Sequence, residues 1–331
     1  MAFFGIRFDL RNPEFAGTSM AERYAAALDM ASWADRLGFV MLSLSEHHGS
    51  PDGYLPSPLP MAAAVAVRTE RIAVYVAAMI ASFHDPLRLA EDAAVVDLLS
   101  EGRLNLIIAN GYVPDEFAMF GVPMGERAAR TTETIRVLQQ AWAGAPFEHR
   151  GRTVQVTPTP FNAGGPALVL GGSSDGAARR AARLGVGYQP SNGDSWPAFR
   201  AECEAQGRLD PGEYLGGDST VVILGSDPDA MWDAIAPYAL HEANAYGAWA
   251  VAAGITTGYS GASDADELRA SGQYRVLTPD QLVAELQAKG PFAFAVLHPM
   301  LGGIPPDLAW ESLHLLEHEV LPRLGADTVQ A

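Results

Sequence analysis

The sequence predicts an α/β fold, a (β/α)8 TIM barrel with insertions. Three observations support this prediction. Eight short apolar segments, each the length of a buried strand, alternate with segments of helical periodicity. No shift in composition divides the chain, so residues 1–325 are expected to form one domain. The length of 331 residues suits one barrel with insertions. A doubly wound open sheet is the main alternative.

The first four strand–helix pairs end near residue 143. Ser19 is a candidate N-cap for the first helix, and the Leu37-Gly38 pair is a helix-stop signal before the second strand. Pro86 lies in the first turn of the third helix, where its missing N–H costs nothing. The predicted strands are 4–8, 39–44, 71–78 and 103–109, and the predicted helices are 20–37, 58–68, 86–100 and 127–143.

The second half of the chain repeats the alternation with two insertions. Residues 144–165 are rich in Gly, Pro and Thr and fit an inserted turn or hairpin. Residues 254–277 form the second insertion, which has no clear periodicity over most of its length. The predicted strands are 167–171, 186–189, 220–224 and 292–297, and the predicted helices are 175–184, 195–207, one that begins at 227, 278–289 and 306–321.

Composition limits the classes of partner. Lys and Arg number 22 and Asp and Glu number 39, which gives a formal net charge of −17. Wide contact with nucleic acid or an anionic membrane is therefore not expected, although backbone amides can still hold one small phosphorylated ligand. A single cysteine, Cys203, excludes an internal disulfide and a thiolate metal cage. With no secretory signal pattern and no apolar run of about 18 residues, a cytoplasmic enzyme is expected.

Polar residues follow the predicted strands at their carboxyl ends. The most informative segment is Ser45-Glu46-His47-His48-Gly49, because an acid and two imidazoles after a buried strand are costly unless they serve a site. In a parallel barrel, all such segments meet on one face, where ligands bind. The segments expected to converge there are Ser45-Glu46-His47-His48, Ser82-Phe83-His84-Asp85, Asn110-Gly111-Tyr112, Gly171-Gly172-Ser173-Ser174, Ser191-Asn192 and His298-Pro299-Met300.

Gly171-Gly172-Ser173-Ser174-Asp175-Gly176 lies between a predicted strand and a predicted helix. Glycines let a backbone approach a ligand closely, and successive N–H groups at a helix start can hold an anion. The segment fits a phosphate site, and it also fits a tight turn in which a serine caps the helix. It is neither a GxGxxG motif nor a P-loop, so a Rossmann or NTPase assignment receives no support.

Two weaker signals lie at the ends of neighbouring strands. Asn110 can donate and accept hydrogen bonds, and Gly111 permits close approach of a ligand. Ala77 and Ala78 end the third strand with minimal side chains, which leaves room for a flat ring above the barrel mouth. Each pattern also occurs in plain turns or ordinary cores.

A metal site is the chief alternative for the histidines. His47, His48, His84 and His298, together with Asp9, have the side chains that ligate metals. Metal-dependent barrel hydrolases usually carry His-x-His at the end of strand one. That strand runs Gly5-Ile6-Arg7-Phe8-Asp9 in this chain and has no histidine. No metal site is therefore predicted, and a metal-dependent hydrolase remains the less favoured alternative.

Several motifs, in order and spacing, resemble the bacterial luciferase-like flavin-dependent monooxygenases. That superfamily includes deazaflavin (F420)-dependent oxidoreductases, and the resemblance covers nearly all of the chain. Each motif is degenerate, but the series is specific. The motifs are those at 45–48, 85–92, 98–104, 110–112, 116–122, 171–174 with 177–182, and 319–322.

The resemblance implies a flavin over the carboxyl ends of the strands. His47 matches the family histidine beside the reactive ring and Glu46 is its neighbour, so both are catalytic candidates. Ala77-Ala78 matches a position where many members have a non-proline cis peptide. The remaining matches place Asn110 and Gly111 beside the ring and phosphate, and Gly171, Gly172, Ser173 and Ser174 around the phosphate.

Other strand-end residues bear on the substrate. His84, Tyr112 and His298 are the candidate substrate contacts. The chain has Ala109 and Asn110 where luciferase itself has a reactive cysteine and an arginine, so light emission is not expected. Residues 254–277 do not match cleanly, so the sequence does not specify the substrate.

The implied function is that of a flavin-dependent monooxygenase. Reduced FMN from a separate flavin reductase, together with O2, would oxidise a small organic substrate, and His47 would donate a hydrogen bond or shuttle a proton. F420-dependent hydride transfer assisted by His47 and Glu46, a metal-dependent hydrolase and a catalytically idle relative stay open as alternatives. Family habit also implies a homodimer, for which the alanine-rich face of 58–67 is a candidate surface.

Overall fold

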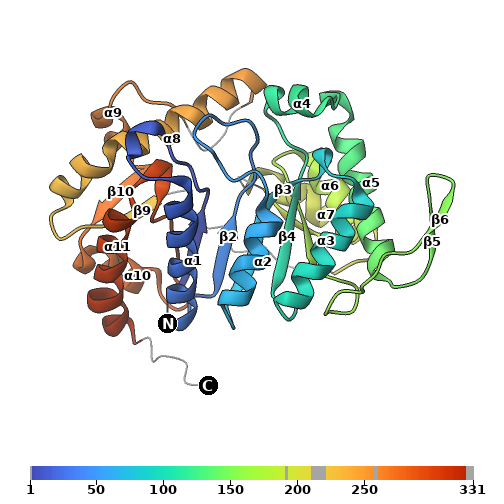
Figure 1. Cartoon of the computed structure of the whole chain (residues 1–331), viewed down its shortest axis with the longest axis horizontal. Helices are drawn as coiled ribbons and strands as arrows, with labels where there is room; N and C mark the ends of the chain where they lie inside the picture. The colour runs from blue at the N-terminus through green and yellow to red at the C-terminus, as the bar shows by residue number, and fades with distance from the viewer. Residues whose placement is uncertain (1, 191–192, 210–220, 256–259, 326–331) are drawn as a thin grey trace.

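A parallel sheet surrounded by helices forms the centre of the protein (Figure 1). The computed structural model describes residues 2–190, 193–209, 221–255 and 260–325. Nine strands in these residues form the sheet, with bounds β1 (Phe3–Phe8), β2 (Met41–Leu44), β3 (Ala73–Ile80), β4 (Leu104–Ala109), β7 (Ala167–Gly171), β8 (Gly187–Gln189), β9 (Val221–Leu224), β10 (Tyr274–Leu277) and β11 (Phe294–Leu297).

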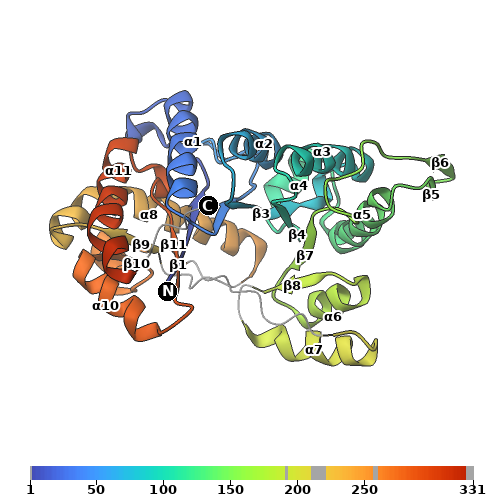
Figure 2. The same cartoon turned by 90° about the horizontal axis from the view of Figure 1, so that it is seen from below.

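The helices lie outside the sheet and over one end of it (Figures 1 and 2). They are α1 (Met20–Arg36), α2 (Pro58–Arg68), α3 (Pro86–Leu99), α4 (Pro114–Phe120), α5 (Arg127–Trp142), α6 (Asp175–Leu184), α7 (Trp196–Ala205), α8 (Pro228–Ala253), α9 (Ala265–Ala270), α10 (Pro279–Lys289) and α11 (Pro306–Leu315), with short 3₁₀ and π turns between some of them. None of the described helices has both the length and the apolar character that crossing a bilayer requires.

The strand order confirms the barrel and excludes the doubly wound alternative. It runs β10-β9-β11-β1-β2-β3-β4-β7-β8, with parallel pairing throughout. A doubly wound sheet reverses its winding direction at a switch point, whereas this order advances in one direction from β1 to β8. The last predicted strand, β11, returns to pair with β1, as barrel closure requires.

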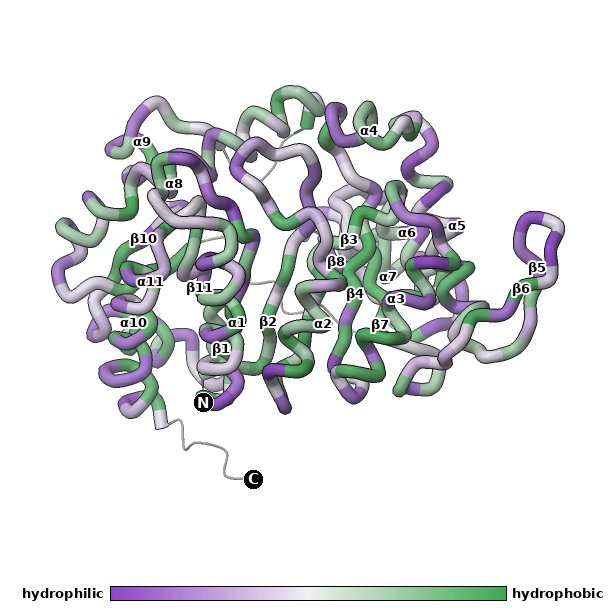
Figure 3. The backbone as a smooth tube through the Cα atoms, in the orientation of Figure 1, coloured by the Kyte–Doolittle hydropathy of each residue, from purple (hydrophilic) through white to green (hydrophobic). Residues whose placement is uncertain are grey.

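Two parts of the prediction were incomplete. The second insertion, 254–277, contains α9 and a ninth strand, β10, which pairs with the outer side of β9. Within the described residues, no pairing is recorded between β8 and either β9 or β10. The first insertion, 144–165, contains the antiparallel hairpin of β5 (Phe147–His149) and β6 (Arg152–Val154), which projects from the barrel with a hydrophilic tip (Figure 3).

The core lies between the sheet and its helices. Ile6, Leu42 and Val74 stand side by side across three strands and are fully buried. Local signals act as expected: Ser19 caps α1, accepting a hydrogen bond from the backbone N–H of Glu22, and proline occupies the first turn of α3 and α10.

Helix α8 crosses the carboxyl end of the barrel and is held near its middle (Figure 1). The turn Leu301–Gly303 packs against it so closely that a Cβ at Gly302 would overlap the carbonyl oxygen of Tyr238. Buried Arg23 fixes this turn by donating hydrogen bonds of 2.8–3.0 Å to the carbonyls of Met300, Gly303 and Ile304. The middle of α8 therefore has little freedom to move.

Candidate active site

His47 lies beyond the carboxyl end of β2, where the sequence placed it, and is held by a carboxylate. Its Nδ1 is 2.8 Å from Oε1 of Glu116, which also accepts the backbone N–H of His48 at 2.8 Å. His47 is 8% exposed and Glu116, on α4, is 1% exposed. A carboxylate only accepts, so Nδ1 carries the proton and Nε2 is the nitrogen left for acid–base chemistry.

The sequence did not identify Glu116 as a site residue. It occurred only inside the family motif at 116–122, and α4 was not predicted as a helix. Its contact with His47 joins residues 69 positions apart. Glu116 could have been found as an acidic residue in the loop after the fourth strand, because that loop converges on the same barrel face as His47.

Glu46 has partners other than His47. Its Oε1 accepts hydrogen bonds of 2.8 Å from Nε2 of both His48 and His84, and its Oε2 accepts the backbone N–H of Ile80 at 2.7 Å. Burial alone would raise the pKa of Glu46, but these hydrogen bonds outweigh it and lower the pKa to about 2. Within the described residues, Glu46 thus anchors His48 and His84.

This lowered pKa predicts how stability depends on pH. A carboxyl with a folded pKa near 2 and an ordinary value of 4.5 stabilises the fold above pH 4.5, and this contribution is lost as the pH falls towards 2. Glu46→Gln is expected to lower the free energy of unfolding at pH 7 by on the order of 3 kcal/mol, a deficit that shrinks between pH 4.5 and 2. Urea unfolding over this range measures it, with exposed Glu204→Gln as control. A deficit independent of pH would contradict the assignment.

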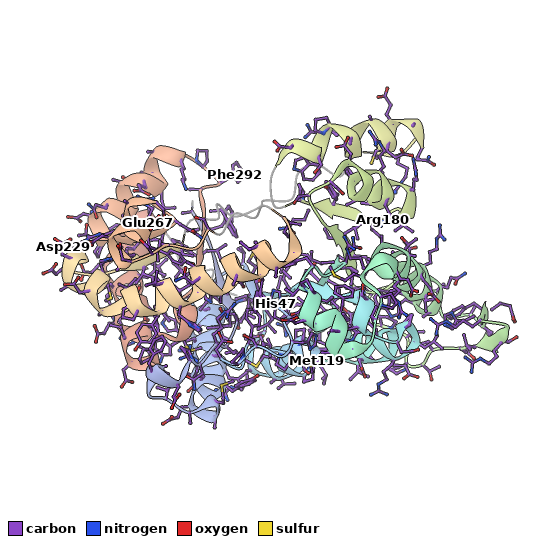
Figure 4. All side chains as sticks on the ribbon, turned by 90° about the horizontal axis from the view of Figure 1, so that it is seen from above. His47, Met119, Arg180, Asp229, Glu267 and Phe292 are labelled. Carbon is purple, nitrogen blue, oxygen red and sulfur yellow. The ribbon has the colours of Figure 1, made fainter. Side chains whose placement is uncertain are left out.

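Four aromatic side chains, here called the aromatic cluster, surround the imidazole of His47. They are Tyr54, Tyr112, Tyr246 and Trp249. Trp249 stacks on the imidazole, with ring centroids 4.3 Å apart and planes at 29°. The three tyrosines meet it edge to face at 4.8–6.0 Å. Figure 4 shows His47 between α8 and α4. Only Tyr112 was predicted for this site.

A buried cation lies against the same rings. The guanidinium carbon of Arg11 is 4.7–4.9 Å from the ring centroids of Tyr54, Tyr246 and Trp249. Arg11 is paired with Asp52 at 2.5 Å and with Asp9 at 3.4 Å. Burial lowers its pKa, but the surrounding tyrosines and carboxylates reverse that effect and raise it above the ordinary value. Its charge is therefore compensated.

His298 belongs to a buried charged group deeper in the barrel. Its Nε2 is 3.6 Å from Asp9, and its Nδ1 is 3.7 Å from Glu242 on α8. Asp9, Glu242 and His298 are the described residues whose potential metal-ligating atoms lie close together. The imidazole stands between the two carboxylates and turns a different nitrogen to each, and both distances are too long for hydrogen bonds.

The ends of β3 and β4 fit a flat ring. The Ala77–Ala78 peptide is cis, as the family resemblance implied, and both alanines are half-buried although their neighbours in β3 are buried. Oδ1 of Asn110 is buried and has no hydrogen-bond partner among the described residues. Gly111 has φ of +78°, and a Cβ there would come within 2.7 Å of Ile80. These residues leave space and an unused acceptor.

The loop after β7 fits a phosphate. Ser174 caps α6 by accepting the backbone N–H of Ala177, so its own O–H can still donate outward. Gly172 has φ of +143°, and Ser173 and Ser174 are exposed. The first N–H groups of α6 have no partners within the helix and can hold an anion. Serine cap and phosphate site are thus compatible. Ser191-Asn192 lies outside the described residues.

The family model for luciferase-like monooxygenases matches residues 4–291. The chain belongs to the luciferase-like monooxygenase family. Among solved structures, the monooxygenase RslO1 from Streptomyces bottropensis is 27% identical, with a TM-score of 0.76 over 98% of this chain and 100% of that one. The oxygenating constituent of 3,6-diketocamphane monooxygenase from Pseudomonas putida, in complex with FMN, is 18% identical, with a TM-score of 0.71 over 97% and 98%. The latter likeness concerns the fold alone.

Matches to curated members of the luciferase-like family are partial. The oxygenase component of the flavin-dependent trigonelline monooxygenase from Acinetobacter baylyi is 29% identical over 138 residues, which are 41% of this chain and 38% of that protein. The chain spans 42%, 39% and 32% of the first curated relatives that it matches. These matches support membership of the family, but they cover less than half of each curated protein.

Proposed function

We propose that this luciferase-like protein is the oxygenase of a two-component system, in which reduced FMN and O2 oxidise a small organic substrate. The observation that carries the proposal is the His47–Glu116 pair, at the barrel end that also has the ring and phosphate loops. Reduced FMN, when bound, would supply the electrons that activate O2. Ala77, Ala78, Asn110 and Gly111 would border its ring, and Gly171, Gly172, Ser173 and Ser174 would hold its phosphate.

In this proposal, the residues around His47 control protons and water. Glu116 fixes the imidazole so that Nε2 can accept or return a proton of the substrate. The aromatic cluster keeps His47 nearly buried, which limits the entry of water. Glu46 supports the site indirectly, because it orients His48 and His84.

A separate flavin reductase is part of the proposal. The trigonelline relative is named as an oxygenase component, which supports a system with separate oxygenase and reductase proteins. A cytoplasmic location stays a prediction. The proposed homodimer is supported by exposed apolar side chains on α2 and α3, namely Val67, Val95, Leu98 and Leu99. A monomer mass in sedimentation at micromolar concentration would contradict the dimer.

Cofactor titration tests the proposed function. The purified chain is titrated in parallel with FMN, reduced FMN and F420 while flavin or deazaflavin fluorescence is recorded. We expect saturable binding of reduced FMN in the absence of O2, and formation of an oxygenated product once O2 and a candidate substrate are added. Tight binding of F420 without O2 consumption would favour hydride transfer instead. Failure to bind either cofactor, with a stoichiometric metal found by elemental analysis, would favour the hydrolase alternative.

A further inference from the structure

We infer that Trp249 is the substrate-facing ring of this site and that the substrate is an uncharged, flat, conjugated compound. The inference rests on the proposed function, because it assigns the substrate class of the same site. Trp249 covers the face of His47, at a centroid distance of 4.3 Å. A substrate that reaches this face must lie against the indole or take its place.

Among the described residues, Trp249 is held by ring contacts alone, unlike Tyr54 and Tyr246. The hydroxyls of Tyr54 and Tyr246 are hydrogen-bonded to each other at 2.9 Å, and Arg7 donates to Tyr246 at 3.0 Å. For Trp249, the described residues provide stacking and a cation–π contact with Arg11, and no hydrogen bond to its indole N–H is recorded among them. The indole is half-buried, so it is open on one side.

The position of Trp249 in its helix adds to this freedom. It lies four residues before the end of α8 at Ala253, beyond the contacts of α8 with the Leu301–Gly303 turn and of Gly247 with Gly261. Val251, on the same terminal turn, is 82% exposed. Helix ends fray more readily than helix centres, so the indole can yield to a ligand with little cost to the barrel.

The charges around the cluster favour an uncharged ligand. Arg11 already occupies the cation–π position beside three of the rings, so that position is closed to a cationic ligand. Asp9 and Asp52 compensate Arg11, so an anionic ligand would meet carboxylates as well as the cation. Stacking on flat faces is the interaction that remains, and it selects conjugated rings.

The α4 side of the site is apolar as well. On α4, Met119 is 64% exposed and Phe120 is 40% exposed, and Phe120 packs against His48 at 4.7 Å. Figure 4 shows Met119 on α4, near His47. An apolar compound therefore meets exposed apolar side chains on the α4 side of the site.

A matched pair of ligands tests the inference. Calorimetry compares 2-naphthol with decahydro-2-naphthol, which has the same skeleton without conjugation, on the FMN-loaded protein. We expect 2-naphthol to bind about tenfold more tightly. Trp249→Ala is expected to weaken its binding by about 3- to 10-fold and to leave decahydro-2-naphthol unchanged, because one stacked aromatic pair is lost. Trp249→Phe is expected to retain most of the preference.

Controls separate this inference from the proposed function. Trp310→Ala removes a half-buried indole on α11, stacked on His314, and is expected to leave the preference intact. Equal binding of the two ligands, no effect of Trp249→Ala, or tighter binding of cationic N-methylquinolinium would overturn the inference.

FMN affinity is measured on every variant. If the wild type binds no FMN, the proposed function fails, and the ligand preference is still measured on the unloaded protein. If Trp249→Ala abolishes FMN binding, the ring faces the cofactor and the inference is wrong.

Discussion

His47→Ala is expected to reduce kcat by about 10²- to 10⁴-fold, the usual contribution of a positioned acid–base group. Nε2 of His47 is the imidazole nitrogen left available for acid–base chemistry, because Nδ1 is bound to Glu116. The fold is expected to persist, since His47 lies in the loop after β2, outside the strands and helices. The measurement is stopped-flow O2 consumption and product formation with reduced FMN.

His48→Ala is the matched control for this substitution. His48 is the next residue and has an imidazole of similar burial, but its Nε2 is already bound to Glu46. Its loss is expected to lower kcat less than tenfold and to act chiefly on stability. Equal losses of kcat in the two variants would mean that the catalytic role has been assigned to the wrong imidazole.

Glu116→Gln is expected to lower kcat by about 10- to 100-fold, a typical loss when the partner that orients a functional histidine is changed. Glu116 is a positioning residue, because it acts through His47. KM and the Kd for FMN are expected to stay within about threefold of the wild-type values. Glu116 orients the imidazole of His47, so its loss should change the chemical step most. Steady-state kinetics and fluorescence titration measure both.

Two comparisons separate positioning from a general structural role. Asp115→Asn removes the neighbouring exposed carboxylate in the same turn of α4 and is expected to leave kcat unchanged. The double variant of His47→Ala with Glu116→Gln is expected to lose no more activity than His47→Ala alone, because the carboxylate works through the imidazole. Additive losses would show that Glu116 acts independently of His47.

The sequence predicted the barrel because its strands are short, apolar and regularly separated by helices. Strand β10 was missed because its four residues, Tyr274–Leu277, follow a Gly- and Ser-rich stretch and include an arginine. The cis peptide at Ala77–Ala78 was expected because these two small residues at a strand end matched a family position.

The partners of His47 could not be read in the same way. Glu116 is brought to it by the short helix α4, and Tyr246 and Trp249 are brought by α8 from nearly 200 residues away. The sequence predicted that a helix begins at 227 but not where it ends, so nothing located its last turns over the site. Glu46 was predicted to act with His47 because the two are neighbours in the sequence. Successive residues of an extended segment, however, point to opposite sides.

One face of α8 joins distant parts of the protein. Tyr238 meets the Leu301–Gly303 turn, Glu242 faces His298, Tyr246 bonds Tyr54, and Trp249 covers His47. The helix spans about 16 Å between the first and last of these positions. Substrate preference could thus drift during evolution through changes at Gly302 or Glu242, which would rotate or slide the helix, while every residue that touches the substrate stayed the same.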